Sequence, residues 1–307
     1  MQRARVSDQV ARIVFIVCAV LIVLIMVGVF YVIGSQAFTV FSATSPQAFF
    51  FGNFWDPTGA GDPSGNSNPS FGARGLIIGS VVITLLAVII AAPLAIGLAL
   101  LFTEAAPRWL TRILQPLIEI FTGIPSVVVG VLGLIILVPF LQKVSAPLTG
   151  NSAVGGFGWG AATIVLVVMI LPTVISVSID ALRAVPTSVR EASLALGSTT
   201  WQTMKNAVIP AAAPGLGTAV VLGMARAIGE TLAVALVLGG SQAPSKIFAW
   251  QSLFGPNVNI TQQIAQDFGE TLGTARAAYW TLAFLLLIIS FICICISRYI
   301  TSRSVYR

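Results

Sequence analysis

The chain contains 307 residues, of which 57 % are hydrophobic and 8 % are charged, and it has no histidine. Soluble domains carry about a quarter charged residues, so this composition excludes an ordinary water-soluble enzyme. It also excludes intrinsic disorder, which needs low hydrophobicity and high charge. Without histidine the chain has no imidazole metal ligand and no Ser-His or Cys-His catalytic pair. The remaining class is an all-α integral membrane protein.

Apolar stretches long enough to cross a membrane occur six times. A transmembrane helix needs about 20 mostly apolar residues, because the hydrocarbon core is ~30 Å thick. In chain order the stretches are residues 13–34, 76–102, 120–141, 160–179, 211–239 and 277–297. The first is longer than the core of a signal peptide, so we expect an uncleaved anchor rather than a cleaved leader. An even number of spans places both termini on the same side of the membrane.

The Lys and Arg residues fall mainly on one side of these spans. Cytoplasmic loops of membrane proteins collect Lys and Arg, and this bias sets the orientation. If the N-terminus is inside, eleven of these residues are cytoplasmic and four are external, so the net charge of +6 is a topology signal and not a sign of nucleic-acid binding. The eleven are Arg3, Arg5, Arg12, Arg108, Arg112, Arg183, Arg190, Lys205, Arg298, Arg303 and Arg307. The four are Arg74, Lys143, Lys246 and Arg276.

Two long segments are expected outside the membrane. Residues 35–74 begin with an aromatic half that suits a belt at headgroup level and end in a half rich in Gly, Pro, Asn and Ser, which favours turns. The segment is either a docking surface for an external partner or an insertion on the membrane surface. Residues 240–276 form either an interfacial helix or a loop that folds back toward the spans.

The cytoplasmic segment 183–210 is predicted to contain two short helices. Ser188 with Glu191 fits a capping box, and Thr199 with Gln202 fits a second one. Gly197 lies between them, where the end of a helix favours a positive φ. Pro210 marks the position where the next span can begin. Each helix has an apolar side, which is either covered by another protein or packed under the chain's own bundle.

Catalysis by this chain alone is not expected. No G-x-x-x-x-G-K-[ST] loop is present, and none of the three lysines follows a suitably spaced pair of glycines. No nucleophile lies beside a recognisable base. Cys18, Cys293 and Cys295 are interpreted as small apolar residues, without a disulfide framework, a metal site or a cofactor.

Arg226 and Glu230 form the most specific feature of the spans. Charged residues at the centre of a span cost about 2.5–3.5 kcal/mol each on the insertion scale, so they persist mainly for a partner or a transport pathway. At positions i and i+4 the two side chains can pair. A guanidinium that faces a cavity matches an oxyanion such as phosphate or sulfate, whereas the alternative is a structural ion pair between helices. Small residues that allow a close helix contact recur every four positions: Gly215, Ala219, Gly223 and Ala227.

Other polar residues lie near the ends of the spans. Thr122 and Ser126 flank Gly-Ile-Pro and either line a broken helix near a substrate or bond to the carbonyl four residues earlier. Glu104, Glu119 and Asp180 lie toward the cytoplasmic side, where we expect water to solvate them.

The cytoplasmic segment resembles the signature of ABC-importer permease subunits, which reads Glu-Ala-Ala, three residues, Gly, and a spacer that ends in Ile-x-Leu-Pro. Here it reads Glu191-Ala192-Ser193, then Leu-Ala-Leu, Gly197, nine residues and Ala207-Val208-Ile209-Pro210. The exchanges at residues 193, 207 and 209 are small or apolar. Residues 123–128 (GIPSVV) and 225–233 (ARAIGETLA) resemble the phosphate-specific permeases, in particular the first of that pair.

The resemblance implies a type I ABC importer permease fold over residues 75–297, after an anchor helix and external loop at 1–74 and before a cytoplasmic tail at 298–307. It implies four kinds of partner besides membrane lipid: a second, homologous permease, an ATPase dimer, an external phosphate-binding protein and the phosphate ion. Glu191, Ala192, Ser193, Gly197 and Pro210 would belong to the region that couples to the ATPase. Arg226 and Glu230, with Thr122 and Ser126, would lie on the substrate path.

The sequence therefore predicts one half of the channel of an ATP-driven phosphate importer in the bacterial inner membrane, with both termini in the cytoplasm. A permease for another oxyanion, sulfate or molybdate, is the first alternative. A self-sufficient anion transporter is the second, although the two matching sets of broken helices expected of one are not evident in the sequence. A membrane-bound structural or sensor subunit would need neither the charged pair nor the coupling loop.

Overall fold

The computed structural model describes residues 2–59, 69–149, 155–240 and 253–304, and almost all of them are helical. The elements before the third apolar stretch are α1 (Gln2–Ala37), η1 (Phe38–Ser42), α2 (Pro46–Phe51), β1 (Trp55–Asp56), β2 (Ser70–Phe71), α3 (Arg74–Leu100) and η2 (Leu101–Ala105). The next are α4 (Arg108–Gly123), α5 (Ser126–Leu132), η3 (Gly133–Leu137), α6 (Val138–Thr149), α7 (Trp159–Arg183), α8 (Thr187–Ala195) and α9 (Thr200–Thr203). The last are η4 (Met204–Val208), α10 (Ile209–Gly229), α11 (Leu232–Leu238), α12 (Ile260–Asp267), η6 (Phe268–Glu270) and α13 (Gly273–Ser304).

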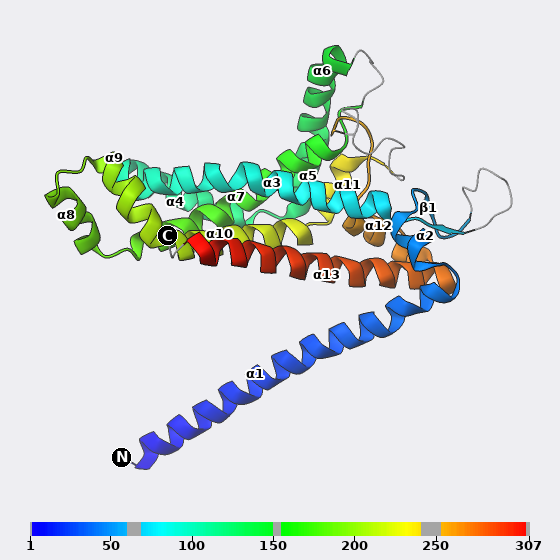
Figure 1. Cartoon of the computed structure of the whole chain (residues 1–307), viewed down its shortest axis with the longest axis horizontal. Helices are drawn as coiled ribbons and strands as arrows, with labels where there is room; N and C mark the ends of the chain where they lie inside the picture. Colours follow the sequence, from blue (N-terminus) through cyan, green and yellow to red (C-terminus); the bar gives the residue numbers. More distant parts are fainter. Residues whose placement is uncertain (1, 60–68, 150–154, 241–252, 305–307) are drawn as a thin grey trace.

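Six helical segments of the described chain are long and apolar enough to cross a membrane, which confirms the predicted number of spans. The long helices α3, α7, α10 and α13 run along the long axis of the molecule, whereas α6 of the third span points away from it and α1 of the first span lies oblique to it (Figure 1). The short helices α8 and α9 lie at one end, together with both termini, and α2, β1 and α12 lie at the other. We refer to these as the α8–α9 end and the α2–β1 end. Termini at the same end are what an even number of spans requires.

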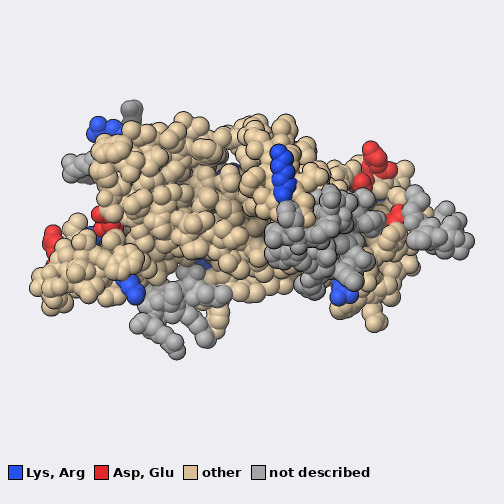
Figure 2. All heavy atoms as spheres, turned by 90° about the horizontal axis from the view of Figure 1, so that it is seen from above, with Lys and Arg blue, Asp and Glu red and all other residues tan. Residues whose placement is uncertain are grey.

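Charged side chains gather mainly toward the two ends of the long axis, and the surface between them is mostly uncharged (Figure 2). Charge in the hydrocarbon region is costly, so a band without charges between two charged ends is typical of a membrane-spanning bundle. The distribution agrees with the predicted spans.

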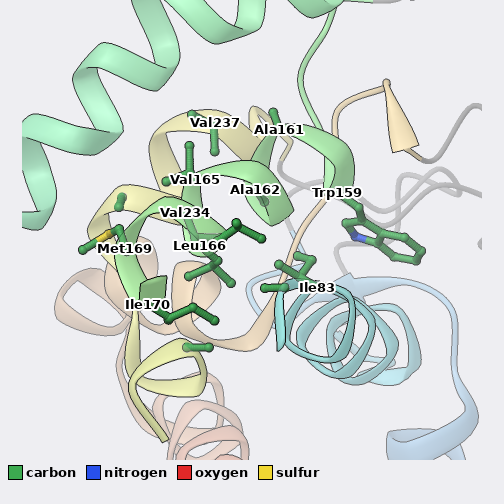
Figure 3. Close-up of a cluster of buried hydrophobic side chains, with 14 of the residues drawn as sticks. Ile83, Trp159, Ala161, Ala162, Val165, Leu166, Met169, Ile170, Val234 and Val237 are labelled. Atoms are coloured by element: carbon green, nitrogen blue, oxygen red, sulfur yellow. The ribbon is translucent and has the colours of Figure 1, made fainter. Parts of the chain in front are cut away.

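The core of the bundle is built around α7, which packs against both α3 and α10. Figure 3 shows Ala162, Leu166 and Ile170 of α7 directed toward Ile83 of α3 and Val234 of α11. Helices in a membrane gain little from the hydrophobic effect, because lipid tails are as apolar as Leu, so close van der Waals packing holds them together. The central position of α7 therefore depends on how closely its neighbours can approach.

The predicted small-residue stripe of α10 lies at this contact. A methyl group built on Gly215 would lie 2.5 Å from Cβ of Ala181, and one built on Gly223 would lie 2.5 Å from Cγ2 of Val174. Ala219 and Ala227, between and beyond the glycines, are buried. The stripe thus sets the distance between α10 and α7.

The third span is organised differently from the single stretch predicted at residues 120–141. The chain breaks at Ile124 and Pro125, which are extended, so α4 ends at Gly123 and α5 begins at Ser126. Both α4 and α5 contact α7. Beyond the π-helical turn η3, α6 points away from the bundle (Figure 1). Pro125 explains the break, because the residue before a proline is disfavoured in a helix.

The first span, α1, leaves the rest of the molecule. It contacts α13 and η1 near its C-terminal end and then diverges from the bundle (Figure 1). Apolar side chains on all sides of it are exposed, Phe15 at 73 % and Ile25 at 63 % among them. A helix with this surface requires a lipid or protein environment that the chain itself does not supply.

The aromatic half of segment 35–74 forms a small core rather than only a headgroup-level belt. Phe49, Trp55 and Phe71 are buried against Tyr279 of α13. The ring centroids of Phe49 and Trp55 are 6.0 Å apart, and those of Trp55 and Tyr279 are 5.6 Å apart, both with edge-to-face geometry. Aromatic pairs prefer this arrangement. Most of the Gly- and Pro-rich part, residues 60–68, lies outside the described residues.

We expect Gly223→Ala to destabilise the protein by about 1–3 kcal/mol, because the added methyl group overlaps Val174 and forces α10 away from α7. The measurement is the melting temperature in detergent. Gly97→Ala is the matched control, because Gly97 lies within α3 and a methyl group there meets nothing within 4 Å. An equal or higher melting temperature for Gly223→Ala than for the unsubstituted chain would contradict the packing described for α10.

Candidate functional site

The fifth apolar stretch, which the sequence predicts as continuous over residues 211–239, is interrupted. The helix α10 ends at Gly229, Glu230 is extended with φ −71° and ψ 124°, and α11 begins at Leu232. The charged residues therefore lie at an interruption of the span, where backbone groups lose their helical partners. Non-helical backbone at membrane depth is tolerated only where protein buries it or it lines a cavity.

Arg226 and Glu230 form the predicted ion pair. The Nε of Arg226 lies 3.8 Å from Oε1 of Glu230, and the two side chains are 28 % and 13 % exposed. The pairing crosses the end of α10, so it is not the contact along one helical face that spacing alone had suggested. Both side chains are partly accessible, so a small ion can approach them.

A third residue, Thr173 of α7, holds the arginine in place. The Nη1 of Arg226 donates a hydrogen bond of 2.9 Å to Oγ1 of Thr173. A guanidinium has five N–H donors, and Thr173 and Glu230 engage two of its three nitrogens. Sequence reasoning missed Thr173 because it is 53 residues away on another helix. Its hydroxyl is one of several in this span, which also contains Thr163, Ser176 and Ser178, so no local signal distinguished it.

The described part of segment 240–276 folds back over this interruption, as the second of its two predicted alternatives required. Thr261 of α12 donates to the backbone oxygen of Glu230 at 3.3 Å. Asn259 caps α12 by accepting from the Gln262 amide at 2.8 Å, and the Ile260 amide donates to Oγ of Ser80 on α3 at 2.9 Å. Residues 241–252 lie outside the described part. The described remainder covers the open end of α10.

Thr122 and Ser126 flank a broken helix, which is the backbone geometry that the substrate-path interpretation required. Thr122 is exposed and donates to the Ile118 carbonyl at 3.0 Å, which is the bond four residues back that the other interpretation predicted. Ser126 is half-buried at the start of α5. Among the recorded hydrogen bonds of the described chain, none joins either hydroxyl to Arg226 or Glu230. Their role on a substrate path stays a prediction.

The helix α4 has two distinct exposed faces beside the face that packs on the bundle. Leu114 and Ile118 form the packed face. A polar stripe with a spacing of three or four residues runs toward the break: Arg112, Gln115, Glu119 and Thr122. An apolar face lies beside it and contains Trp109, Ile113, Leu117 and Ile120. A membrane helix with an exposed polar stripe is expected to face protein or a water-filled cavity along that stripe.

The segment at the α8–α9 end has the two predicted helices. The turn after α8 is a Schellman motif, in which the Ser198 amide donates to Ser193 O at 3.4 Å and the Gly197 amide to Leu194 O at 2.9 Å. Gly197 has φ +84°, the left-handed conformation predicted for it. The Thr199–Gln202 capping box is present with both bonds.

Two details of this segment differ from the predictions. The Ser188–Glu191 capping box is absent, because α8 begins at Thr187 after Pro186 and has no side-chain cap. The fifth span does not begin at Pro210, because a helix continues from α9 through the π-helical turn η4 into α10. Pro210 instead lies in the first turn of α10. Proline has no backbone N–H to donate, and it is tolerated here because the preceding π-helical turn η4 already departs from the α-helical hydrogen-bond pattern.

The two sides of α8 differ in exposure. The inner side is formed by Val189, Arg190 and Ser193, and Oγ of Ser193 lies 3.1 Å from Oγ1 of Thr203 on α9. Glu191 and Ala192 are exposed on the outer side. The apolar residues Leu196 and Trp201 are 88 % and 64 % exposed. The outer surface of α8 and α9, from Glu191 to Trp201, therefore presents apolar groups that the bundle does not cover.

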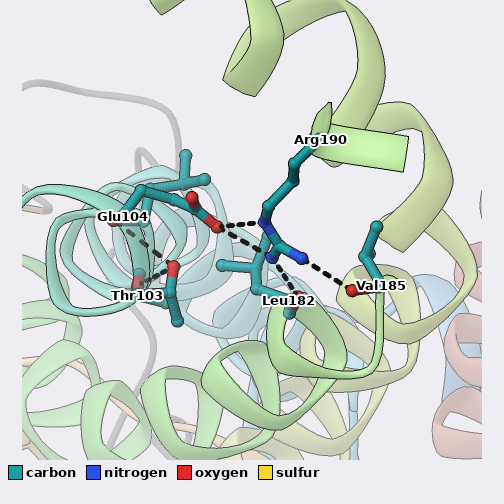
Figure 4. A network of polar contacts seen from close by, with 7 residues as sticks. Thr103, Glu104, Leu182, Val185 and Arg190 are labelled. Atoms are coloured by element: carbon teal, nitrogen blue, oxygen red, sulfur yellow. Dashed lines mark hydrogen bonds and ion pairs between the residues drawn. The ribbon is translucent and has the colours of Figure 1, made fainter. Parts of the chain in front are cut away.

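Arg190 makes a set of contacts that sequence reasoning missed, because Glu104 had been interpreted as a solvated carboxylate. Its Nη2 and Nε lie 2.9 Å and 3.2 Å from Oε1 of Glu104 in η2. Its Nη1 and Nη2 also donate to the carbonyl oxygens of Val185 and Leu182 at 2.6 Å and 2.9 Å. Figure 4 shows the guanidinium between the end of α3 and the end of α7. Glu104 is 86 residues distant in sequence, so spacing could not reveal the partner.

These features define a multi-pass membrane protein with a charged pair inside its bundle and a helical loop at one end. Residues 91–305 match the family model of the binding-protein-dependent transport system inner membrane component. The chain belongs to this family. It is an ABC importer permease and thus a transport component.

Curated relatives cover nearly the whole chain. A probable ABC transporter permease protein, YqgH, of Bacillus subtilis (strain 168) is 39 % identical over 98 % of this chain and 93 % of its own length. The phosphate transport system permease protein PstC of Xylella fastidiosa (strain 9a5c) is 35 % identical over 83 % of this chain and 79 % of its own.

Solved structures share the fold at low sequence identity. The MetNI methionine ABC transporter in an inward-facing conformation is 22 % identical, with a TM-score of 0.55 over 76 % of this chain and 96 % of that chain. A bacterial ABC transporter that imports alginate has a TM-score of 0.52 at 14 % identity, over 74 % and 78 % of the two chains. The likeness shows the type I ABC importer permease fold predicted from the cytoplasmic signature.

We expect Thr173→Val to lower stability by about 1–3 kcal/mol, because it leaves a partly buried Arg226 donor without its acceptor. Thr173→Ser keeps the hydroxyl and is the matched control, so its melting temperature in detergent should stay close to that of the unsubstituted chain. Equal melting temperatures for the Val and Ser variants would show that the bond does not hold Arg226.

Proposed function

We propose that this permease is one half of the translocation pathway of an ATP-driven importer of inorganic phosphate, and that a separate ATPase hydrolyses the ATP. The observation that carries the proposal is Arg226, a guanidinium inside the bundle that is 28 % exposed and is positioned by Thr173 and Glu230. Its N–H groups match the oxygens of a tetrahedral oxyanion. Glu230 balances the charge of Arg226, so the anion is bound weakly enough to be released.

The choice of phosphate rests on relatives. Several of them, from Xylella fastidiosa, Pasteurella multocida and other bacteria, are phosphate transport system permease proteins at 31–35 % identity. One arginine does not by itself distinguish phosphate from sulfate or molybdate, since all three present oxygens to the same donors. A permease for one of those oxyanions is therefore the second candidate.

The orientation follows from charge. With the α8–α9 end in the cytoplasm, eleven Lys and Arg residues are inside and four are outside. Both termini lie at that end (Figure 1), which supports a cytoplasmic location for both. The α2–β1 end then faces the binding protein outside, and the aromatic core of Phe49, Trp55 and Phe71 gives that end a rigid surface.

A second, homologous permease would complete the pathway. The polar stripe of α4, with Glu119 and Thr122, is exposed in the isolated chain although α4 runs beside α7 in the bundle. A facing permease would enclose this stripe and Arg226 in a water-filled path between the two subunits. Ser126, at the break after α4, would lie at the same path. The diverging helix α1 offers a second apolar surface to the partner or to lipid.

The ATPase dimer would bind the outer surface of α8 and α9. Glu191, Ala192 and Gly197 are exposed there, and Leu196 next to Gly197 is 88 % exposed. An exposed apolar patch on a short helical pair marks a protein interaction site. Ser193 and Pro210, which belong to the same signature, lie on the inner side and at the start of α10, where they support the docking helix.

We expect the double variant Arg226→Gln/Glu230→Gln to assemble, because it removes both charges together, and to import phosphate about 10- to 100-fold more slowly. Hydrogen bonds to charged groups contribute about 1.5–3 kcal/mol, which corresponds to that factor. The measurement is ATP-dependent uptake of radiolabelled phosphate into proteoliposomes that hold the whole complex. Arg183→Ala, which removes an exposed arginine at the end of α7, is the charge control. Uptake at the unsubstituted rate by the double variant would refute the role of Arg226.

We expect Leu196→Asp to leave the melting temperature of the isolated permease unchanged, because the side chain is already exposed. The amount of ATPase that co-purifies with the same variant in mild detergent should fall at least tenfold, since the variant places a charge at the centre of an apolar interface. Asn206→Asp adds a charge at an exposed position of η4 and is the control. Undiminished co-purification with Leu196→Asp would exclude this surface as the docking site.

A further inference from the structure

The two arginines with the most specific contacts in this molecule bind the same helix, α7. Arg226 of α10 binds Thr173 near the middle of α7. Arg190 of α8 binds the Leu182 carbonyl in the last turn of α7 and the Val185 carbonyl just after it. Leu182 and Thr173 are nine residues apart, so the two attachment points are separated by about 13 Å of continuous helix.

Arg190 is more than a surface ion pair with Glu104, because it is largely buried and binds two helices at once. The side chains of Arg190 and Glu104 are only 21 % and 13 % exposed. One guanidinium binds a carboxylate at the end of α3 and two carbonyl oxygens at the end of α7, and its positive charge also suits the negative end of that helix dipole. A planar fork with five donors can make these bonds at once, whereas the ammonium of a lysine cannot reach the same geometry.

Arg190 attaches α8 to two other parts of the bundle. The helix α8 has no side-chain cap at its N-terminus. Its polar side-chain attachments are Arg190, to Glu104 in η2 and to the end of α7, and Ser193, which contacts Thr203 of α9. Arg190 leads directly to the ends of α3 and α7, whereas Ser193 leads to α9, which continues through η4 into α10.

We propose that Arg190 is the positioning residue that transmits displacement of the docking helix α8 to α7, and through Thr173 to Arg226. The proposal rests on the proposed function, because it takes α8 to be the helix that the ATPase moves. A shift of α8 pulls on the Leu182 and Val185 carbonyls through the fork, and Glu104 moves the end of α3 with them. Since α7 is one helix between Leu182 and Thr173, the shift changes the position of the Arg226 acceptor.

The test measures how many ATP molecules are hydrolysed for each phosphate imported by the reconstituted complex of both permeases, the ATPase and the binding protein. We expect Arg190→Lys to co-purify with the same amount of ATPase, because it keeps the positive charge beside Glu104, and to raise this ratio about fivefold or more, at the lower end of typical coupling between sites. Glu104→Gln keeps one acceptor oxygen for Arg190 and should raise the ratio less. Arg183→Ala is the control and should leave it unchanged.

A ratio for Arg190→Lys equal to that of the unsubstituted complex would overturn the proposal, since assembly alone does not require the fork geometry. If Arg190→Ala fails to assemble, the ratio measured for Arg190→Lys still tests the proposal. The proposed function is tested separately by the unsubstituted complex. If that complex imports phosphate and Arg190→Lys remains fully coupled, the transmission route is wrong while the function stands.

Discussion

A peptide group in hydrocarbon must have a hydrogen-bond partner, and this constraint decides where the spans of this protein can be interrupted. The fifth span stops at Gly229 and resumes at Leu232, which frees backbone groups at membrane depth. The chain meets the constraint by folding α12 over the break, so that Thr261 donates to the carbonyl of Glu230. The side chain of Asn259 caps α12, and Ser80 of α3 accepts from the Ile260 amide. The segment between the fifth and sixth spans thus becomes part of the bundle so that one interruption can exist.

The interruption is what makes a charged pair possible inside the span. Where α10 ends, Glu230 is extended and can turn toward Arg226, and Thr173 fixes the other side of the guanidinium. The charges compensate each other, while both groups remain partly accessible. A structural ion pair would not need the accessibility. The pair therefore combines local neutrality with a set of donors that an oxyanion can use.

The helix α7 is the element on which the rest converges. The glycines of α10 allow close contact with it, α4 and α5 lie against it, and its carbonyl end receives Arg190. Because α7 runs without a break from Thr173 to Leu182, it joins the contact of Arg226 to the contact of Arg190. This arrangement connects the pair in the membrane with the docking surface at the α8–α9 end without any further element.

The parts that sequence could predict are those that local pattern determines. Hydropathy located six spans, and Gly197 with its flanking residues identified a Schellman turn, because only a left-handed residue ends α8 in that way. The signature at residues 191–210 predicted the type I ABC importer permease fold, which the solved structures share, whereas the docking surface stays a prediction. Thr173 and the Arg190–Glu104 contact could not be found, since each joins helices far apart in sequence.

The two segmentation errors have physical reasons as well. Ile124 and Pro125 break a stretch that is continuously apolar. Hydropathy could not predict the break, because it measures the average polarity of a window and not the backbone conformation that a proline imposes on the residue before it. The predicted cap at Ser188 failed because α8 begins directly after Pro186, two residues earlier than the capping pattern requires. In both cases a proline determined the geometry.

The central claim is that this permease admits phosphate past Arg226 only as part of an ATP-driven complex. The most direct measurement is uptake of radiolabelled phosphate into proteoliposomes that contain either the permease alone or the permease with its second permease, ATPase and binding protein, with sulfate and molybdate as competitors. The account predicts ATP-dependent uptake by the full complex, no uptake by the permease alone, and no competition by excess sulfate or molybdate. Phosphate uptake by the permease alone, or equal competition by sulfate, would contradict it.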